Sequence, residues 1–215
     1  MSRSLSRRGR WGIGILAVLT AGGAVLLLYQ RKEQAAEIDR LVETLELEAG
    51  SRLADVGAGK GRVAFALAER VGPGGQVLAT EIDAKRLRQM RDTIERRRIE
   101  NVTVVEAGET ETGLADACCE AAYLRDVYHH LGDPAAIDAS LFRAIRPGGR
   151  LVVIDFEPSW FLSRLFPVEH APANRGGHGV SPEIVIGELT AAGFELERRI
   201  DEWGFGSFAV VFRRP

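Results

Sequence analysis

Short apolar runs alternate with longer amphipathic stretches from about residue 34 to the end of the chain. Five of these runs are rich in Val, Leu, Ala and Ile, which is typical of strands that are buried in a sheet. They cover residues 52–56, 76–81, 102–105, 121–126 and 151–155. Because strands that alternate with helices pair in parallel, the pattern predicts an α/β fold with a doubly wound, mostly parallel sheet.

The amphipathic stretches predict the helices of this fold. Helices are expected over 34–47, 61–71, 83–98 and 181–192. Asp83 is suited to cap the third of them, because its carboxylate can accept bonds from the first backbone N–H groups. Beyond the last helix, residues 194–200 and 207–212 are predicted to be two closing strands.

The N-terminal part has a different hydropathy. Residues 12–29 form an uncharged, mostly apolar run, bracketed by Trp11 and Tyr29. As a helix this run would be about 27 Å long, which is close to the hydrocarbon thickness of a bilayer. We therefore predict one transmembrane helix over 12–29, within an N-terminal segment 1–32. A cleaved signal peptide or a twin-arginine export signal fits less well, because apolar residues continue after the small residues at 21–24.

Charge is also distributed unevenly. Residues 1–32 carry six basic residues and no acid, so residues 33–215 have a net charge of −8 within the total of −2. An acidic body argues against a nucleic-acid substrate, since phosphate binding needs a basic surface. The only two cysteines, Cys118 and Cys119, are adjacent and are expected to be reduced structural thiols.

A glycine-rich turn follows the first predicted strand and carries the strongest chemical signal. The strand ends at Asp55 and Val56, and Gly57, Gly59 and Gly61 come next, before a predicted helix. Glycine allows a sharp turn and lets a ligand lie against the backbone. The third glycine of a dinucleotide site is missing, because Arg62 stands in its place.

Three further signals follow in order. Glu81 ends the second strand, about 20 residues past the turn, where a carboxylate can accept the hydroxyls of a ribose. Gly108 and Glu109 follow the third strand, and the turn 146–149 (Arg-Pro-Gly-Gly) precedes a late apolar strand. With these four signals in this order, residues 45–215 resemble the class I S-adenosylmethionine-dependent methyltransferases.

The resemblance implies a Rossmann-like, seven-stranded sheet with an antiparallel C-terminal hairpin in a domain over 33–215. It also implies S-adenosylmethionine as the cofactor, with Asp55 at its amino group, Glu81 at its ribose, and Glu109 or the nearby Glu111 at its adenine. Ile82 and Thr110 would flank the adenine ring. The residues expected to bind the cofactor are Asp55, Gly57, Ala58, Gly59, Gly61, Glu81, Ile82, Glu109, Thr110 and Asp126.

The segment 126–131, which follows the fourth strand, is the candidate for the substrate side. Methyl transfer is an in-line displacement, so the protein has to align the acceptor and, for an O–H or N–H acceptor, remove a proton. The imidazoles of His129 and His130 are suited to this role, with Asp126 beside them. The alternative is that these side chains cap a helix or pack against the cofactor. The apolar segment 157–179 is expected to shape the acceptor pocket. Within it, His178 is expected to bond backbone in a loop, and the alternative is that it faces the acceptor.

The sequence therefore predicts a methyltransferase that acts on a small or lipophilic acceptor near the membrane. The alternatives are methylation of a membrane protein, a non-catalytic module that binds S-adenosylmethionine, and a nicotinamide dehydrogenase. Four arginines before the span favour a cytoplasmic N-terminus, but S-adenosylmethionine is cytoplasmic, so we expect the catalytic domain in the cytoplasm. No nucleic-acid partner and no metal site are expected, since the four histidines lack ligand spacing.

Overall fold

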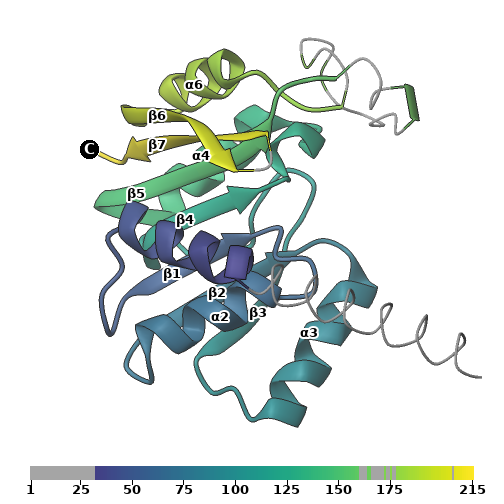
Figure 1. The fold of residues 1–215 in the computed structure, drawn as a ribbon, viewed down its shortest axis with the longest axis vertical. Coiled ribbons are helices and arrows are strands. Elements are labelled where there is room, and N and C mark those ends of the chain that lie inside the picture. Colours follow the sequence, from purple (N-terminus) through teal and green to yellow (C-terminus); the bar gives the residue numbers. More distant parts are fainter. Residues whose placement is uncertain (1–31, 160–163, 166–171, 173–174, 176–177, 205) are drawn as a thin grey trace, which may run out of the picture. The chain divides into compact units, whose positions relative to one another are not determined.

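A seven-stranded mixed sheet forms the centre of the fold, with the strand order β3-β2-β1-β4-β5-β7-β6 (Figure 1). The computed structural model describes residues 32–159, 164–165, 172, 175, 178–204 and 206–215. The predicted span 12–29 lies outside these residues. Within the described part of the chain, no helix is both long enough and apolar enough to cross a membrane. Two units are distinguished, residues 1–41 and 42–215, and the sheet belongs to the second.

Each of the seven predicted strands is present. The strands are β1 (Arg52–Val56), β2 (Gln76–Glu81), β3 (Val102–Glu106), β4 (Cys119–Arg125), β5 (Ile145–Phe156), β6 (Glu195–Gly204) and β7 (Ser207–Arg213). The first five pair in parallel, and β7 pairs antiparallel with both β5 and β6. The prediction of a mostly parallel sheet with an antiparallel C-terminal hairpin is therefore confirmed.

The turn at residues 146–149 differs from the prediction. These residues belong to β5, which begins at Ile145 rather than at Leu151. The pairing with β4 shifts between Cys119 and Ala121, so the Pro-Gly-Gly stretch forms an irregularity within the strand. Gly148 has φ +79°, a left-handed conformation that favours glycine.

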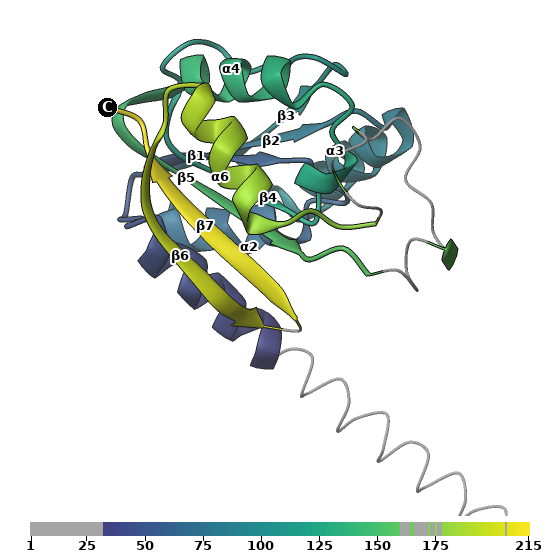
Figure 2. The same ribbon diagram turned by 90° about the horizontal axis from the view of Figure 1, so that it is seen from above.

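Helices cover both faces of the sheet. Their bounds are α2 (Arg62–Val71), α3 (Ala84–Arg97), η1 (a 3₁₀ turn, Tyr128–His130), α4 (Pro134–Ala144) and α6 (Pro182–Ala191). Helices α4 and α6 lie on one face and α2 lies on the other (Figure 2). Asp83 caps α3, as predicted, by accepting a bond from the backbone N–H of Arg86 at 2.8 Å. Residues 32–44 are helical, so this helix ends three residues earlier than predicted.

The main apolar core lies between the sheet and the helices α4 and α6. Side chains of β1, β4 and β5 meet those of both helices in it, including Leu124, Leu141, Val153 and Leu189. The strand order reverses between β1 and β4, because β1 continues to β2 on one side while β4 continues to β5 on the other. Ligands of open α/β sheets bind at such a point, beyond the carboxyl ends of the strands.

Candidate functional site

The loop after β1 is held in shape by backbone bonds to the end of β2. Gly57 N–H and Ala58 N–H both donate to the Thr80 carbonyl, at 3.0 and 2.8 Å. Gly59 N–H donates to the Glu81 carboxylate at 2.9 Å. Three backbone donors thus tie the glycine turn to the neighbouring strand, and the turn is fixed before any ligand binds.

Two of the glycines serve different purposes. Gly57 has φ +77°, and a Cβ there would lie 2.6 Å from Cγ2 of Val127, so the loops after β1 and β4 touch at this point. Gly59 has φ +60°, and a Cβ there would meet no atom within 4 Å. The first glycine therefore allows close packing between loops, while the second leaves open space beside the backbone.

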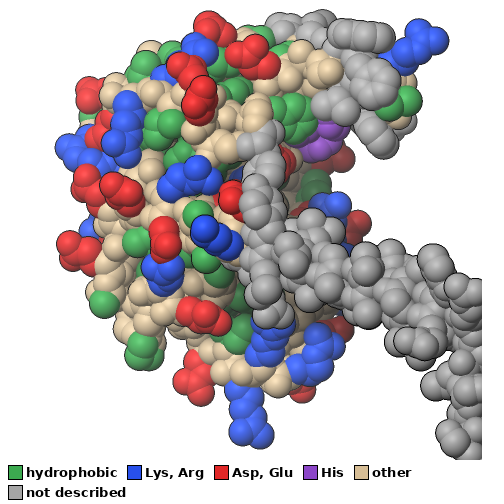
Figure 3. All heavy atoms as spheres, viewed as in Figure 1, with side chains coloured by type: hydrophobic (Ala, Val, Ile, Leu, Met, Phe, Trp, Pro, Cys, Tyr) green, Lys and Arg blue, Asp and Glu red, His purple; other side chains and the backbone are tan. Residues whose placement is uncertain are grey.

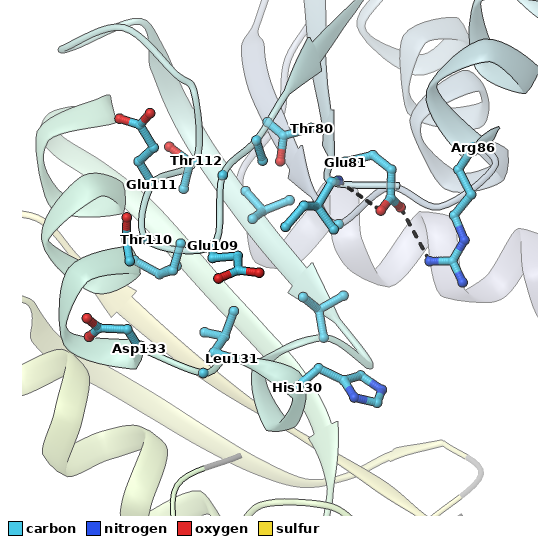
Figure 4. A pocket seen from close by; sticks show the side chains of 18 of the residues that line it. Thr80, Glu81, Arg86, Glu109, Thr110, Glu111, Thr112, His130, Leu131 and Asp133 are labelled. Atoms are coloured by element: carbon cyan, nitrogen blue, oxygen red, sulfur yellow. Dashed lines mark hydrogen bonds and ion pairs between the residues drawn. The ribbon is translucent and has the colours of Figure 1, made fainter. Parts of the chain in front are cut away.

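Glu81 is the best-positioned acid of the predicted set. Its side chain is buried, and Oε1 accepts bonds from Ile82 N–H at 2.9 Å and Asp83 N–H at 3.0 Å. Oε2 accepts the bond from Gly59 and lies 3.5 Å from Nη1 of Arg86. These bonds fix the carboxylate between the glycine turn and the start of α3, where it faces a cavity (Figure 4).

This cavity, of about 950 Å³, lies at the carboxyl ends of β1, β2 and β4. One wall is the segment 107–112, and the other includes the loop 125–133. Figure 4 shows Glu109 pointing into the cavity towards Leu131, whereas Glu111 points away. The geometry thus favours Glu109 over Glu111. Ile82 also lines the cavity and is 54% exposed, which is typical of an apolar contact for a ligand.

Asp55 lies beneath the glycine turn instead of lining the cavity. It is 4% exposed, and its carboxyl lies beside the Tyr123 side chain, on the adjacent strand, and the Ala64 backbone at the start of α2. Burial raises the pKa of its carboxyl to about 7, although Tyr123, the Ala64 backbone and the charge of Arg125 each act to lower it. The structure gives Asp55 a place in supporting the turn, and its predicted contact with the cofactor remains a prediction.

Loop 125–133 brings the substrate-side candidates to the cavity. Asp126 has φ +55°, uncommon for a residue other than glycine, and it lines the cavity together with His130. Burial raises the pKa of the Asp126 carboxyl, and the nearby Asp155 raises it further. His130 belongs to η1 and is exposed, while its neighbour His129 is buried behind it. Figure 3 shows histidine surface beside acidic side chains on this part of the molecule.

His129 is fixed by Asp155, a residue that the sequence analysis left without a role. Nδ1 of His129 lies 2.8 Å from Oδ1 of Asp155, and the His129 backbone N–H donates to Oδ2 at 3.1 Å. The Phe156 N–H also donates to Oδ1, at 2.9 Å. Acids at the carboxyl ends of parallel strands often face a ligand, so the position of Asp155 at the end of the predicted strand 151–155 was the signal that could have identified it.

A second buried network holds η1 from the other side. The Tyr128 hydroxyl lies 2.8 Å from Asp138 of α4 and 2.9 Å from Glu188 of α6. Since a phenol has one proton, one of the two contacts requires a protonated carboxyl group. Glu188 pairs with Arg175 at 2.9 Å, so Asp138 is the acid that carries the proton and donates it to Tyr128. Burial raises the pKa of Asp138 to about 7, in agreement with this assignment.

His178 meets both histidines of η1. Its ring centroid lies 4.9 Å from that of His129 and 5.8 Å from that of His130. These three rings form an aromatic cluster with Phe156, and the expected bond of the His178 side chain to backbone stays a prediction. Among the described residues, no group of three or more His, Cys, Asp or Glu side chains is arranged to hold a metal ion.

The structure thus brings most of the predicted set together. Those that line the cavity are Gly57, Glu81, Ile82, Glu109, Thr110, Asp126 and His130. The predicted residues Ala58, Gly59 and Gly61 belong to the turn beside it, and Asp55 and His129 lie behind its lining. Arg86, Arg125 and Val127 also line the cavity and were not predicted, because they come from a helix surface and a strand end without a distinctive pattern.

Comparison with known proteins agrees with this geometry. Residues 54–153 match a family model described as a methyltransferase domain. The ubiquinone/menaquinone biosynthesis C-methyltransferase UbiE of Pseudomonas putida is 33% identical over 120 residues, which cover 54% of this chain and 45% of the relative. The 27-O-demethylrifamycin SV methyltransferase of Amycolatopsis mediterranei is 31% identical over 121 residues, which cover 55% and 43%. The chain thus matches less than half the length of these two relatives.

Solved structures share the fold at lower identity. A SAM-dependent methyltransferase from Aquifex aeolicus has a TM-score of 0.68 at 22% identity, covering 83% of this chain and 89% of that one. Geranyl diphosphate C-methyltransferase from Streptomyces coelicolor A3(2), in complex with Mg2+, geranyl diphosphate and S-adenosyl-L-homocysteine, has a TM-score of 0.70 at 14% identity, covering 86% and 82%.

The cavity also suits S-adenosylmethionine. The open space at Gly59 leaves room for a ligand against the backbone, and the buried Glu81 presents acceptor oxygens at the adjacent strand end. A cavity of about 950 Å³ is within the size range of cofactor sites. Residues 54–153 of this chain therefore match a methyltransferase domain, and the fold that holds the cavity is that of solved S-adenosylmethionine-dependent methyltransferases.

Proposed function

We propose that the whole chain is an S-adenosylmethionine-dependent methyltransferase that acts on a small or lipophilic acceptor near a membrane. The observation that carries the proposal is the cavity itself, where the glycine turn, Glu81 and the loop 125–133 converge at the switch point of the sheet. Curated relatives named for small-molecule methylation support the substrate class. Fold similarity alone would be insufficient, because the [4+2]-cyclase SpnF has the same fold with a TM-score of 0.68.

Cofactor binding is tested by calorimetry on the full chain. Titrations with S-adenosylmethionine, S-adenosylhomocysteine and NADH separate a methyltransferase from a nicotinamide dehydrogenase. Glu81→Gln is expected to weaken binding of both sulfur ligands by about 10–100-fold, because hydrogen bonds to charged groups contribute roughly 1.5–3 kcal/mol. Glu111→Gln is the matched control and should leave the affinity unchanged. Glu111 belongs to the segment that lines the cavity, but its carboxylate points away from the cavity. Binding of NADH alone would contradict the proposal.

The apolar run 12–29 supports placing the acceptor at a membrane, where lipophilic molecules partition. We propose that this run anchors the chain, with the methyltransferase domain in the cytoplasm. Leu19→Arg puts a charge in the middle of the run, and a central Arg costs about 2.5–3.5 kcal/mol in a membrane helix. The variant is expected to leave the membrane fraction in cells, whereas Leu19→Ile should remain there. Equal distribution of the two variants would argue against an anchor.

The acceptor is sought among lipophilic phenols, lipid headgroups and hydrophobic thiols. Membrane extracts incubated with methyl-labelled S-adenosylmethionine and the full chain are separated into lipid and protein fractions. Label in the small lipophilic fraction supports the proposal, and label confined to protein would support methylation of a membrane protein instead. A chain that binds the cofactor and labels neither fraction would be a non-catalytic module.

A further inference from the structure

Three imidazoles and one buried carboxylate gather beside the cavity, and the cofactor contacts do not require them. His129 and His130 come from η1, Asp155 ends β5, and His178 comes from the chain between β5 and α6. The ring centroids of His129 and His130 are 4.0 Å apart. Since the cluster borders the cavity through His130, its chemistry bears on the acceptor rather than on the cofactor.

Asp155 fixes the tautomer of His129. Both of its carboxylate oxygens already accept backbone N–H bonds, from His129 and Phe156, so the group presents an acceptor to the imidazole. Nδ1 of His129 therefore carries the proton of its 2.8 Å contact with Oδ1. Nε2 is then the nitrogen with a free lone pair. It is buried and has no hydrogen-bond partner among the described residues, which is costly for a group without a function.

His130 is the member of the cluster that a ligand can reach. Its ring lines the cavity, and neither ring nitrogen bonds another described residue. Burial lowers its pKa, and His129, His178 and Arg86 lower it further, while Asp155 alone among its charged neighbours raises it. The imidazole is thus neutral at neutral pH and able to accept a proton, and the buried Asp155 stabilises the positive charge that this would create.

We propose that His130 is a general base for an acceptor that carries an acidic hydroxyl, a phenol or an enol, and that His129 and Asp155 are its positioning residues. This inference rests on the proposed function. When bound, S-adenosylmethionine would supply a methyl carbon to which the acceptor atom forms its new bond, while the S–CH3 bond breaks and its electron pair stays on sulfur as a neutral thioether. The acceptor O–H bond breaks, its electron pair stays on the acceptor, and the proton moves to a ring nitrogen of His130. His130 then carries a positive charge, which the nearby carboxylate of Asp155 stabilises.

An amine acceptor fits this wall less well. A neutral amine attacks with its own lone pair and can lose its proton after transfer, so it depends less on a base at this position than a hydroxyl does. The part of the lining around His130 includes the apolar side chains of Val127, Leu131 and Ile137, together with the carboxylates of Asp126 and Asp133. Such surroundings suit the ring or chain of a phenol or an enol, which buries apolar area while its hydroxyl meets His130.

The first test needs no turnover. In the full chain labelled with ¹⁵N-histidine, NMR at pH 8 is expected to show one neutral histidine fixed as the Nδ1–H tautomer. In Asp155→Asn this tautomer should no longer be fixed and the pKa of His130 should fall, because the one group that raises it is gone. Asp116→Asn is the control, since Asp116 is an exposed acid outside the cavity. An unchanged tautomer and pKa in Asp155→Asn would overturn the positioning role.

The second test compares two acceptors with the full chain. One is a phenol that is protonated at the assay pH, and the other is a nitro-substituted phenol that is already ionised. His130→Gln is expected to lower kcat/KM for the protonated phenol by about 10²–10⁴-fold, the usual contribution of a general base. Turnover of the ionised phenol should fall much less, because it has no proton to lose.

If His130→Gln lowers kcat/KM equally for both phenols, His130 is not a general base. The proposed function would still stand in that case, provided that the unaltered chain binds the cofactor and turns over an acceptor. A failure of the proposed function differs, because then the unaltered chain methylates neither phenol nor any other acceptor. Since His130 is exposed, His130→Gln tests the proposal even if Asp155→Asn fails to fold.

Discussion

Gly57 is the position of the glycine turn where an added side chain meets the closest packing. Its φ is +77°, and a Cβ there would lie 2.6 Å from Cγ2 and 2.9 Å from Cγ1 of Val127. A left-handed conformation costs a residue other than glycine about 1–2 kcal/mol, and forcing a methyl group into packed space costs typically about 1–3 kcal/mol more. Gly57→Ala is therefore expected to lower the free energy of unfolding by about 2–5 kcal/mol.

Three further variants separate the conformational cost at Gly57 from the steric cost. Gly59 has a similar φ, +60°, but a Cβ there would meet nothing within 4 Å, so Gly59→Ala should cost only the conformational part, about 1–2 kcal/mol. In the double variant Gly57→Ala with Val127→Ala, the nearest remaining atom is the Cβ of residue 127, at 3.3 Å. The double variant should therefore recover most of the steric part, when compared with Val127→Ala alone.

Denaturant unfolding of the full chain, followed by tryptophan fluorescence and circular dichroism, measures these differences. Equal m-values across the four variants are required for the comparison. The contact between the two loops does not explain the need for glycine at 57 if Gly57→Ala lowers the free energy of unfolding no more than Gly59→Ala does. The same holds if Gly57→Ala costs as much in the Val127→Ala background as in the unaltered chain.

Three other predictions concern the buried network and the mouth of the cavity. Burial raises the pKa of Asp138 from 3.8 to about 7, so the folded state binds the proton more tightly and its stability falls as pH rises from about 4 to 7. Ionisation of Asp138 lowers the free energy of unfolding by about 4 kcal/mol between these pH values, and Asp138→Asn cannot ionise. Urea unfolding should therefore find the variant gaining stability relative to the unaltered chain at pH 8 but not at pH 4. The same difference in free energy at both pH values would contradict this. Tyr128→Phe leaves the buried Asp138 without its partner and should cost about 1–3 kcal/mol at pH 7, measured by the same unfolding. Arg86→Gln removes an exposed ion pair to Glu81, so calorimetry should find the affinity for S-adenosylhomocysteine changed by less than about fivefold.

The order of elements followed from the sequence because it depends on local properties. Runs such as 76–81 and 102–105 have the length and composition of buried strands, and Asp83 marks the start of α3 by a bond that spans three residues. The turn at 146–149 was placed wrongly within the sheet, because pairing with β4, distant in sequence, decided that it belongs to β5.

The candidate site divides in the same way. The glycine turn and Glu81 were identifiable because their spacing reflects a turn and a strand end, both of which are set within some 25 residues. The difference between Glu109 and Glu111 depends on which way a loop presents each carboxylate, and the sequence offered no means to choose. Likewise, Asp55 has the right position in the motif, but only the packing of Tyr123 and α2 against it shows that it is buried.

By itself, the sequence determined the class of fold, the order of its elements and the family resemblance, since each of these depends on periodicity and on short motifs. The tertiary structure alone decided that His129 is buried against Asp155 while His130 faces the cavity, and that His178 joins them from a segment some 50 residues away. The physical reason is that adjacent residues differ in exposure only through what packs against them. Those partners come from β5 and from the chain beyond it, at separations where local preferences carry no information.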